Sequence, residues 1–270
     1  MNDRVSYSVE NHIAHIRLIR ADKMNALDDA MIGALIEAGE QLKADKTVRC
    51  AILSGEGRAF CAGLDMANFS RMATGGSGSS VTGKKSGRLA ERTHGITNRP
   101  QHCAWVWREA QVPVIAAVHG VALGGGFQIM CGADIRYAAR DTRFSIMEIR
   151  WGLIPDMGTT HVMARLARED KLKELALTGR IFEAPEAHDT GFVTRVCDDP
   201  LAAAQETAEL IASKNPEAII GIKELFNSQA DRFAPEMLMQ ESVLQDDIIG
   251  APNQIEAVMA ELEKRPAKYA

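Results

Sequence analysis

The stretch PVIAAVHGVALGGGFQ, residues 113–128, joins an apolar run to three consecutive glycines. A second glycine-bearing stretch, GEGRAFCAGLDM, covers residues 55–66 and follows the apolar run 48–53. Each pattern predicts a β-strand that leads through a glycine loop toward a helix. Such loops leave backbone N–H groups without partners at the start of the helix. Two converging loops of this kind can hold an oxygen that becomes negatively charged, which is the requirement of an oxyanion hole.

Length and composition indicate an ordinary soluble globular protein. The chain has 270 residues, of which 46% are hydrophobic and 25% are charged, and its net charge is -5. The basic residues are dispersed, so we expect no nucleic-acid partner. No apolar run approaches the roughly 18 residues of a membrane span, and the N-terminus lacks the apolar segment of a signal peptide. We therefore expect no membrane partner and a cytoplasmic location.

Cysteine and histidine usage gives no sign of a metal site. The five cysteines are widely spaced, odd in number and without a C-x-x-C pair. This pattern argues against both a disulfide framework and a zinc site. The histidines have no metal-ligand spacing either, so we expect no bound metal.

The first 200 residues repeat one structural pattern. Residues 5–19 predict a β-hairpin, and Asp28 begins a helix. Strand 48–53 follows. A strand, a glycine loop and a helix recur at 114–130, and the pattern returns more weakly at 135–138, with a helix after Gly158. The apolar stripe of the first helix is Met31, Leu35, Ala38 and Leu42. These are repeated β-β-α-like units, which predict an α/β fold.

Beyond Pro200 the sequence predicts almost only helix. The expected helices cover 201–214, 216–230, 235–249 and 252–264, with prolines at or near their starts. We therefore divide the chain into a core at 1–200 and a C-terminal helical subdomain at 201–270. The apolar residues of the expected helix 235–249 could pack either on the core or on another subunit, and helical spacing does not distinguish the two. These residues are Met237, Leu238, Met239, Val243, Leu244, Ile248 and Ile249.

Residues 74–87, TGGSGSSVTGKKSG, have the composition of a linker. Such a segment beside a glycine loop fits a mobile loop that admits substrate. It fits a tolerated surface insertion equally well.

The glycines do not form a nucleotide-binding motif. The spacing G-x-G-x-x-G is absent around Gly124, Gly125 and Gly126, and residues 55–84 contain no G-x-x-x-x-G-K-[ST] sequence. A dinucleotide fold and a P-loop are therefore both unsupported.

Four motifs occur in a fixed order along the chain. They are NAL at 25–27, AFCAGLD at 59–65, the stretch 113–126, and F-x-x-x-E-x-x-x-GLIP at 144–155. Together they resemble the crotonase family, also called the enoyl-CoA hydratase/isomerase superfamily, over essentially the whole chain. The resemblance implies a spiral core of β-β-α units, a C-terminal helical region used for trimerisation, and a homotrimer or dimer of trimers. It also implies an acyl-CoA thioester as substrate; coenzyme A is part of that substrate, and no separate cofactor is implied.

The resemblance assigns the oxyanion donors and the substrate contacts. The donors fall on the backbone N–H groups of Leu64 and Gly125. Polarising the thioester carbonyl makes the α-proton acidic, and the two amides stabilise the resulting enolate. Lys23 is the first choice as a phosphate partner, with Lys264 and Lys268 as weaker ones. The full set of expected substrate-binding residues is Lys23, Ala26, Ala62, Leu64, Asp65, Met66, Gly125 and Trp151.

Three side chains decide the reaction. Glu148 matches one of the two glutamates of the family's hydratases, whereas the position of the other is Gln128, whose amide can orient water but cannot act as a base. Asp156 matches an aspartate of the family's dienoyl-CoA isomerases, which also carry an aspartate where this chain has Gln128. The alternative for Asp156 is that it caps the helix after Gly158.

The sequence thus predicts double-bond isomerisation of an enoyl- or dienoyl-CoA. Glu148 is the principal acid/base group and Asp156 its proton partner, in an apolar cleft that pushes their two titrations apart. Hydration of 2-enoyl-CoA by Glu148, with Gln128 orienting water, is the alternative. A CoA-ester binding module without turnover is a further one, which the presence of Glu148 disfavours.

Overall fold

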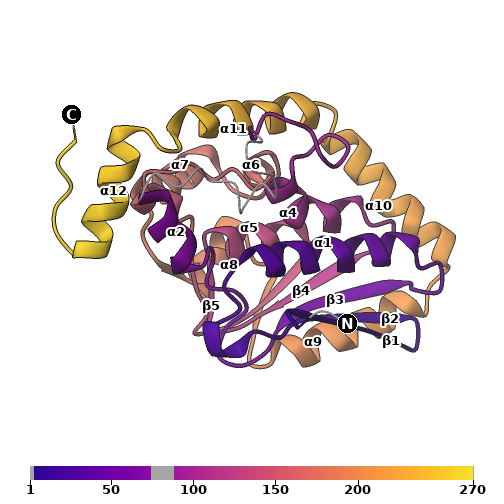
Figure 1. The fold of residues 1–270 in the computed structure, drawn as a ribbon. Helices are drawn as coiled ribbons and strands as arrows, with labels where there is room; N and C mark the ends of the chain where they lie inside the picture. The colour runs from indigo at the N-terminus through magenta and orange to yellow at the C-terminus, as the bar shows by residue number, and fades with distance from the viewer. Residues whose placement is uncertain (1–2, 74–87, 270) are drawn as a thin grey trace.

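The computed structural model describes residues 3–73 and 88–269 (Figure 1). The expectations for 74–87 lie outside the described residues. The strands are β1 (Val5–Glu10), β2 (Ile13–Leu18), β3 (Cys50–Gly55), β4 (Val114–Val118), β5 (Val121–Leu123), β6 (Ile135–Ala139), β7 (Arg143–Ser145), β8 (Phe182–Glu183) and β9 (Arg195–Cys197). The helices are α1 (Asp29–Ala44), α2 (Met66–Ala73), α4 (Arg99–Glu109), α5 (Gly125–Gly132), α6 (Thr160–Leu166), α7 (Glu169–Thr178), α8 (Ala184–Thr190), α9 (Pro200–Ala212), α10 (Pro216–Ala230), α11 (Ala234–Ile248) and α12 (Pro252–Glu263), with 3-10 turns η1 (Ala21–Lys23) and η2 (Glu148–Trp151).

The main sheet has the strand order β1-β2-β3-β4-β6-β9. The β1–β2 pair is antiparallel, with Val5 opposite Leu18, and confirms the predicted hairpin. The pairs from β2 to β9 are parallel. A parallel strand needs a crossover to reach its neighbour, which is why a helix follows most of these strands. The second sheet is small and has the order β5-β7-β8.

Both faces of the main sheet are covered, so the residues of its central strands β3 and β4 are almost all apolar. On one face, Ile52 of β3 and Ile115 of β4 belong to a cluster with the alanines of α9. On the other face, Leu53 and Ala116 join the larger core that also includes α1, α4 and α5. Figure 1 shows α1 above the sheet and α9 below it.

The glycine stretches lie where a strand of the main sheet gives way to a loop. Strand β4 continues through Gly120 into β5 of the small sheet and then into α5. Strand β6 similarly leads to β7 of the small sheet, then to η2 and α6. This alternation between two sheets is the predicted β-β-α repeat, and it places the start of α5 and the whole of η2 at the same end of the molecule.

The predicted first helix begins where expected. The Asp28 side chain accepts a hydrogen bond from the Met31 N–H at 2.8 Å, which caps α1. Strand β3 begins two residues later than predicted. The reason is a turn in which the backbone and the hydroxyl of Thr47 both donate to Asp45.

The C-terminal helices occupy the predicted ranges to within two residues. Helix α9 packs against β3 and β4 and so covers a face of the core sheet, whereas α10, α11 and α12 run around the periphery (Figure 1). Helix α11 is unusual, because its buried face is largely polar whereas several of its apolar side chains are exposed. Buried on α11 are Ala234, Leu238, Glu241, Ser242 and Gln245, whereas Met237, Met239, Val243 and Leu244 are exposed.

Candidate active site

The two glycine loops lie side by side. Cys61 and Ala122 form a parallel bridge, and the Leu123 N–H donates to the Cys61 carbonyl at 3.1 Å. Gly63 has a φ of +86°, and a Cβ there would lie 2.6 Å from the Leu123 carbonyl oxygen. A Cβ at Gly126 would lie 2.8 Å from that of Cys61. Both glycines are therefore required for the two loops to approach so closely.

Leu64 and Gly125, from the two glycine loops, both line the same cavity. Within the described residues, neither N–H has a hydrogen-bond acceptor in the protein. Gly125 is the first residue of α5, so helix geometry itself leaves its N–H unpaired. Two free backbone donors, on residues that line one cavity from separate loops, are what an oxyanion hole requires.

The cavity has a volume of about 490 Å³ and collects residues from distant parts of the chain. Most of the expected site residues line it, whereas Gln128 and the two weaker phosphate partners, Lys264 and Lys268, do not. Those that line it are Lys23, Ala26, Ala62, Leu64, Asp65, Met66, Gly125, Glu148, Trp151 and Asp156. Its largely apolar lining suits an acyl chain.

Glu148 is the first residue of η2, and its carboxyl lies against the second glycine loop. A Cβ at Gly124 would be only 3.4 Å from the Glu148 Oε1 atom. The side chain is 9% exposed, and burial raises its pKa to about 6. Among the described residues, its Oε2 atom has no hydrogen-bond partner. Glu148 is thus a buried carboxyl with one free oxygen next to the oxyanion donors.

Gln128 lies behind Glu148 and outside the cavity lining. It is fully buried, and its Nε2 donates to Glu148 Oε1 at 2.7 Å. Its Oε1 accepts from the Met157 N–H at 2.9 Å and from the Thr159 hydroxyl at 3.2 Å. Both ends of the amide are therefore engaged within the protein. This geometry favours a role in holding Glu148 over the expected role of orienting a water.

Asp156 lies in the turn between η2 and α6 and lines the cavity. Burial raises the pKa of its carboxyl well above the usual value, and the charges of Glu241 and Glu148 raise it further. Asp156 does not cap α6, so the alternative based on capping was wrong. The amides of Gly158 and Thr160 at the start of α6 instead donate to Glu241 of α11, at 2.8 and 3.2 Å.

Sequence reasoning missed Glu241 and Gln245, which both belong to the buried face of α11. Gln245 lines the cavity, and its Oε1 accepts from the Ile154 N–H at 3.1 Å. The side-chain amide of Gln245 also favours the ionised form of Asp156. The spacing of four residues between Glu241 and Gln245 is a helical-face signal, but polar residues at that spacing usually face solvent.

Two of the remaining expected residues have different structural roles: Asp65 holds a loop in place, and Trp151 forms part of the cavity wall. Asp65 receives hydrogen bonds from Arg20 at 2.6 Å and from the Ala67 N–H at 3.0 Å. Burial opposes ionisation of Asp65, but these bonds hold its pKa below the usual value. Asp65 therefore fixes the first glycine loop and the start of α2. Trp151 stacks on Phe69 of α2, with ring centroids 3.8 Å apart, and the two rings form one wall of the cavity.

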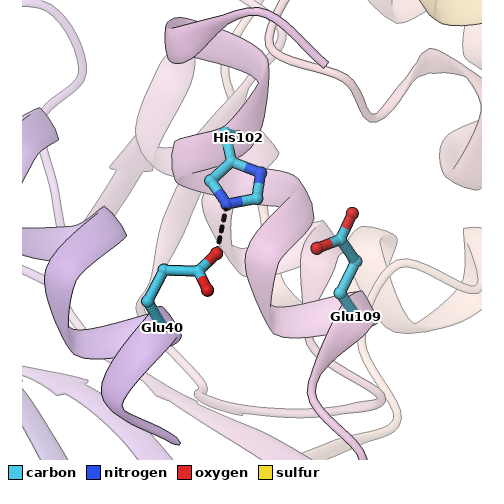
Figure 2. Close-up of side chains that lie close together, drawn as sticks. All are labelled: Glu40, His102 and Glu109. Atoms are coloured by element: carbon cyan, nitrogen blue, oxygen red, sulfur yellow. Dashed lines mark hydrogen bonds and ion pairs between the residues drawn. The ribbon is translucent and has the colours of Figure 1, made fainter. Parts of the chain in front are cut away.

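A second cluster of ionisable groups joins α1 to α4. Figure 2 shows Glu40, His102 and Glu109, whose candidate ligand atoms lie within 4.8 Å of one another. His102 Nε2 lies 2.7 Å from Glu40 Oε1. The Lys43 ammonium donates to Glu40 at 3.0 Å and to Glu109 at 2.8 Å. A cation of the protein itself thus bridges the two carboxylates, and the cluster acts as an ion-pair link between the helices.

Comparison with known proteins identifies the family to which the chain belongs. Residues 8–270 match the family model described as enoyl-CoA hydratase/isomerase, and the chain belongs to this family. One relative is the mitochondrial Delta(3,5)-Delta(2,4)-dienoyl-CoA isomerase of Mus musculus, 31% identical over 97% of this chain and 80% of the relative. Another is the 1,2-epoxyphenylacetyl-CoA isomerase of Escherichia coli K12, 34% identical over 82% of this chain and 80% of the relative.

Solved structures share the fold. An enoyl-CoA hydratase/isomerase from Mycobacterium paratuberculosis superposes with a TM-score of 0.84 at 23% identity, over 96% of this chain and 98% of the other. An enoyl-CoA hydratase from Bacillus halodurans gives a TM-score of 0.83 at 22% identity, over 95% and 99%. Within residues 3–73 and 88–269, no helix is long and apolar enough to cross a membrane.

Proposed function

We propose that this enzyme isomerises the double bonds of a 3,5-dienoyl-CoA to give the 2,4-dienoyl-CoA. The observation that carries the proposal is a pair of carboxyl groups, Glu148 and Asp156, that line one cavity beside two free backbone amides. A hydratase of this family needs a second glutamate at the position of Gln128. Here that position is a neutral amide turned away from the cavity and bonded at both ends.

The environments of the two carboxyls assign their roles. Glu148, with a pKa of about 6, is mostly ionised at pH 7 to 8 and can accept a proton. Asp156 retains its proton to higher pH than an ordinary aspartate and can donate it. Glu148 lies against Gly124, next to the Gly125 amide, so in this proposal it acts on the carbon beside the thioester carbonyl. Asp156, the second carboxyl of the cavity lining, then serves the distal end of the conjugated chain.

The reaction then balances without an added cofactor. The thioester oxygen accepts hydrogen bonds from the Leu64 and Gly125 amides, and Glu148 removes a proton from C2. The electron pair passes into a conjugated trienolate whose negative oxygen the two amides stabilise. Asp156 delivers its proton to C6, the C4–C5 and C2–C3 bonds become double, and the carbonyl re-forms. Proton exchange with solvent returns Glu148 to its ionised form and Asp156 to its protonated form.

Substrate binding follows from the residues that border the cavity. Lys23 at its mouth would meet a CoA phosphate, while the stacked rings of Trp151 and Phe69 would cover the acyl chain. The relatives named as dienoyl-CoA isomerases support this choice of substrate.

The test offers 3,5-dienoyl-CoA and 2-enoyl-CoA separately and follows absorbance. We expect a new 2,4-dienoyl absorption from the first and little change from the second. Glu148→Gln should abolish the signal, whereas Glu183→Gln, which removes a charge from an exposed site, should not. Rapid loss of 2-enoyl conjugation with formation of 3-hydroxyacyl-CoA would instead identify a hydratase.

We also propose that the protein assembles as a homotrimer or a dimer of trimers and acts in the cytoplasm. The exposed apolar side chains of α11, including Val243 and Leu244, support assembly because solvent exposure of such a face is unfavourable. Phe226 of α10 is a further exposed apolar side chain in the C-terminal helices.

A further inference from the structure

The turn that carries Asp156 is held from outside by one buried carboxyl of α11. Glu241 Oε2 accepts from the Gly158 N–H at 2.8 Å and from Gln101 Nε2 at 3.1 Å. Its Oε1 accepts from the Thr160 N–H at 3.2 Å and from the Thr160 hydroxyl. Glu241 is 5% exposed and does not line the cavity.

The four bonds to Glu241 suit an ionised carboxyl. Each oxygen accepts two donors, so a proton on either oxygen would displace one of the bonds. Burial raises the pKa of Glu241, and the four donors oppose that effect. The positive charge of Arg92 partly balances the negative charge of Glu241 through Gln101. Arg92 Nη1 donates to Gln101 Oε1 at 3.1 Å, and Gln101 donates in turn to Glu241.

We propose that Glu241 is a positioning residue that fixes the turn at 155–160 and keeps Asp156 as the proton donor of the catalytic pair. The inference rests on the isomerase function proposed above. Glu241 bonds to the backbone two and four residues beyond Asp156, and thereby sets where that side chain lies. Its negative charge also acts on Asp156 more strongly than that of Glu148 does.

The charged and titratable groups around this pair come from η2, from α11 and from the loop before α4. Asp156 is faced by Glu148 of η2 and by Glu241 and the neutral Gln245 of α11. Glu241 is faced by Arg92 of the loop before α4, which in turn faces Asp246 at the end of α11. Removing the negative charge of Glu241 takes away its repulsion of the Asp156 carboxylate. It also leaves the positive charge of Arg92 without one of its negative neighbours. Both changes favour ionisation of Asp156 and so lower its pKa.

The test measures the protonation of Asp156 without substrate. Aspartate labelled with ¹³C at the carboxyl is titrated by NMR, and the Asp156 signal is assigned by its loss in Asp156→Asn. We expect Glu241→Gln to lower the Asp156 midpoint by at least one pH unit. Asp247→Asn removes a charge from the exposed side of the same helix and should leave the midpoint in place. An Asp156 midpoint equal in wild type and Glu241→Gln overturns the proposal.

A second variant guards against misfolding of Glu241→Gln. Thr160→Val keeps the side-chain shape but removes one donor to Glu241, and we expect a smaller shift of the Asp156 midpoint in the same direction. If Glu241→Gln does not fold, an unshifted midpoint in Thr160→Val overturns the proposal. Kinetics with 3,5-dienoyl-CoA should show a lower kcat in the folded variants with little change in KM. A shifted midpoint in an enzyme that does not isomerise dienoyl-CoA would reject the proposed reaction but retain the role of Glu241.

Discussion

The side-chain amide of Gln128 donates to the carboxyl of Glu148 at 2.7 Å, from a fully buried position behind the cavity. A neutral donor in this place stabilises the ionised form of Glu148 without adding a second negative charge. The proposed isomerisation then takes its second proton-transfer group from Asp156, which lines the same cavity.

Replacing Gln128 with glutamate should raise the pKa of Glu148, because two carboxyls at hydrogen-bond distance cannot both ionise readily. We expect the acidic limb of the pH profile of kcat/KM to move to higher pH in Gln128→Glu. Steady-state rates between pH 5 and 9 measure this. A limb that stays in place would show that Gln128 does not act on Glu148.

The wild-type rate should depend on pH through two groups of opposite sign. Glu148 must be ionised to accept a proton, so kcat/KM should rise with pH and level off above about 6. Asp156 must be protonated, so the rate should fall again as pH passes its raised pKa. The same profile recorded for Asp156→Asn should lose the basic limb; persistence of that limb would assign it to another group.

Glu148→Gln should reduce kcat by about 10²- to 10⁴-fold, the usual contribution of a general base. The same variant should be more stable than wild type at pH 8. Raising the pKa of the folded state from 4.5 to about 6 corresponds to about 2 kcal/mol against the charged form.

The sign of this effect sets the pH window for its measurement. The folded wild type keeps the proton on Glu148 longer than the unfolded chain does, so its stability falls as pH rises from 4.5 to 6. The advantage of Glu148→Gln should therefore be full above pH 6 and shrink toward pH 4.5. Urea unfolding at pH 5 and pH 8 tests this, and equal stability at pH 8 would contradict it.

Gly126→Ala should separate the two glycine loops, because the added Cβ would collide with the backbone and side chain of Cys61. We expect a loss of about 1–3 kcal/mol in unfolding free energy, together with a lower kcat from displaced amides. Gly221→Ala in α10 is the matched control, since a Cβ there meets nothing within 4 Å. That control should be stabilised by about 0.5–1 kcal/mol.

Leu244→Glu should shift the protein toward smaller assemblies if the outer face of α11 is a subunit interface. Light scattering after size exclusion gives the mass directly. Leu177→Glu, at a 72% exposed leucine on α7, serves as the comparison and should leave the mass unchanged. Identical masses for wild type and Leu244→Glu would exclude this face from the interface.

The glycine stretches allowed the position of the site to be predicted, because strand, loop and helix each leave a local signature. Leu64 and Gly125 do line one cavity with Glu148 and Asp156, as the family resemblance implied. The bonding of Gln128 could not be predicted, since its partners at Glu148, Met157 and Thr159 are 20 to 31 residues away in sequence.

The burial of the polar face of α11 could not be predicted from the sequence for a different reason. Periodicity reports which residues share a helix face but not whether that face meets protein or water. The apolar residues Val243 and Leu244 gave the stronger pattern, and they lie outward. Glu241 is inward because the unsatisfied amides at the start of α6 provide donors for its carboxyl, a tertiary relation that no local pattern records.

The cavity draws its lining from both ends of the chain, from Lys23 near the beginning to Ile249 near the end. During synthesis, a chain that has emerged as far as residue 230 contains every strand of both sheets, yet it lacks Glu241 and Gln245. A nascent or truncated protein of that length could fold its sheets and still leave the Asp156 turn unsupported. Enzymatic competence would then arise only once α11 has also been made, after all the strands of the two sheets.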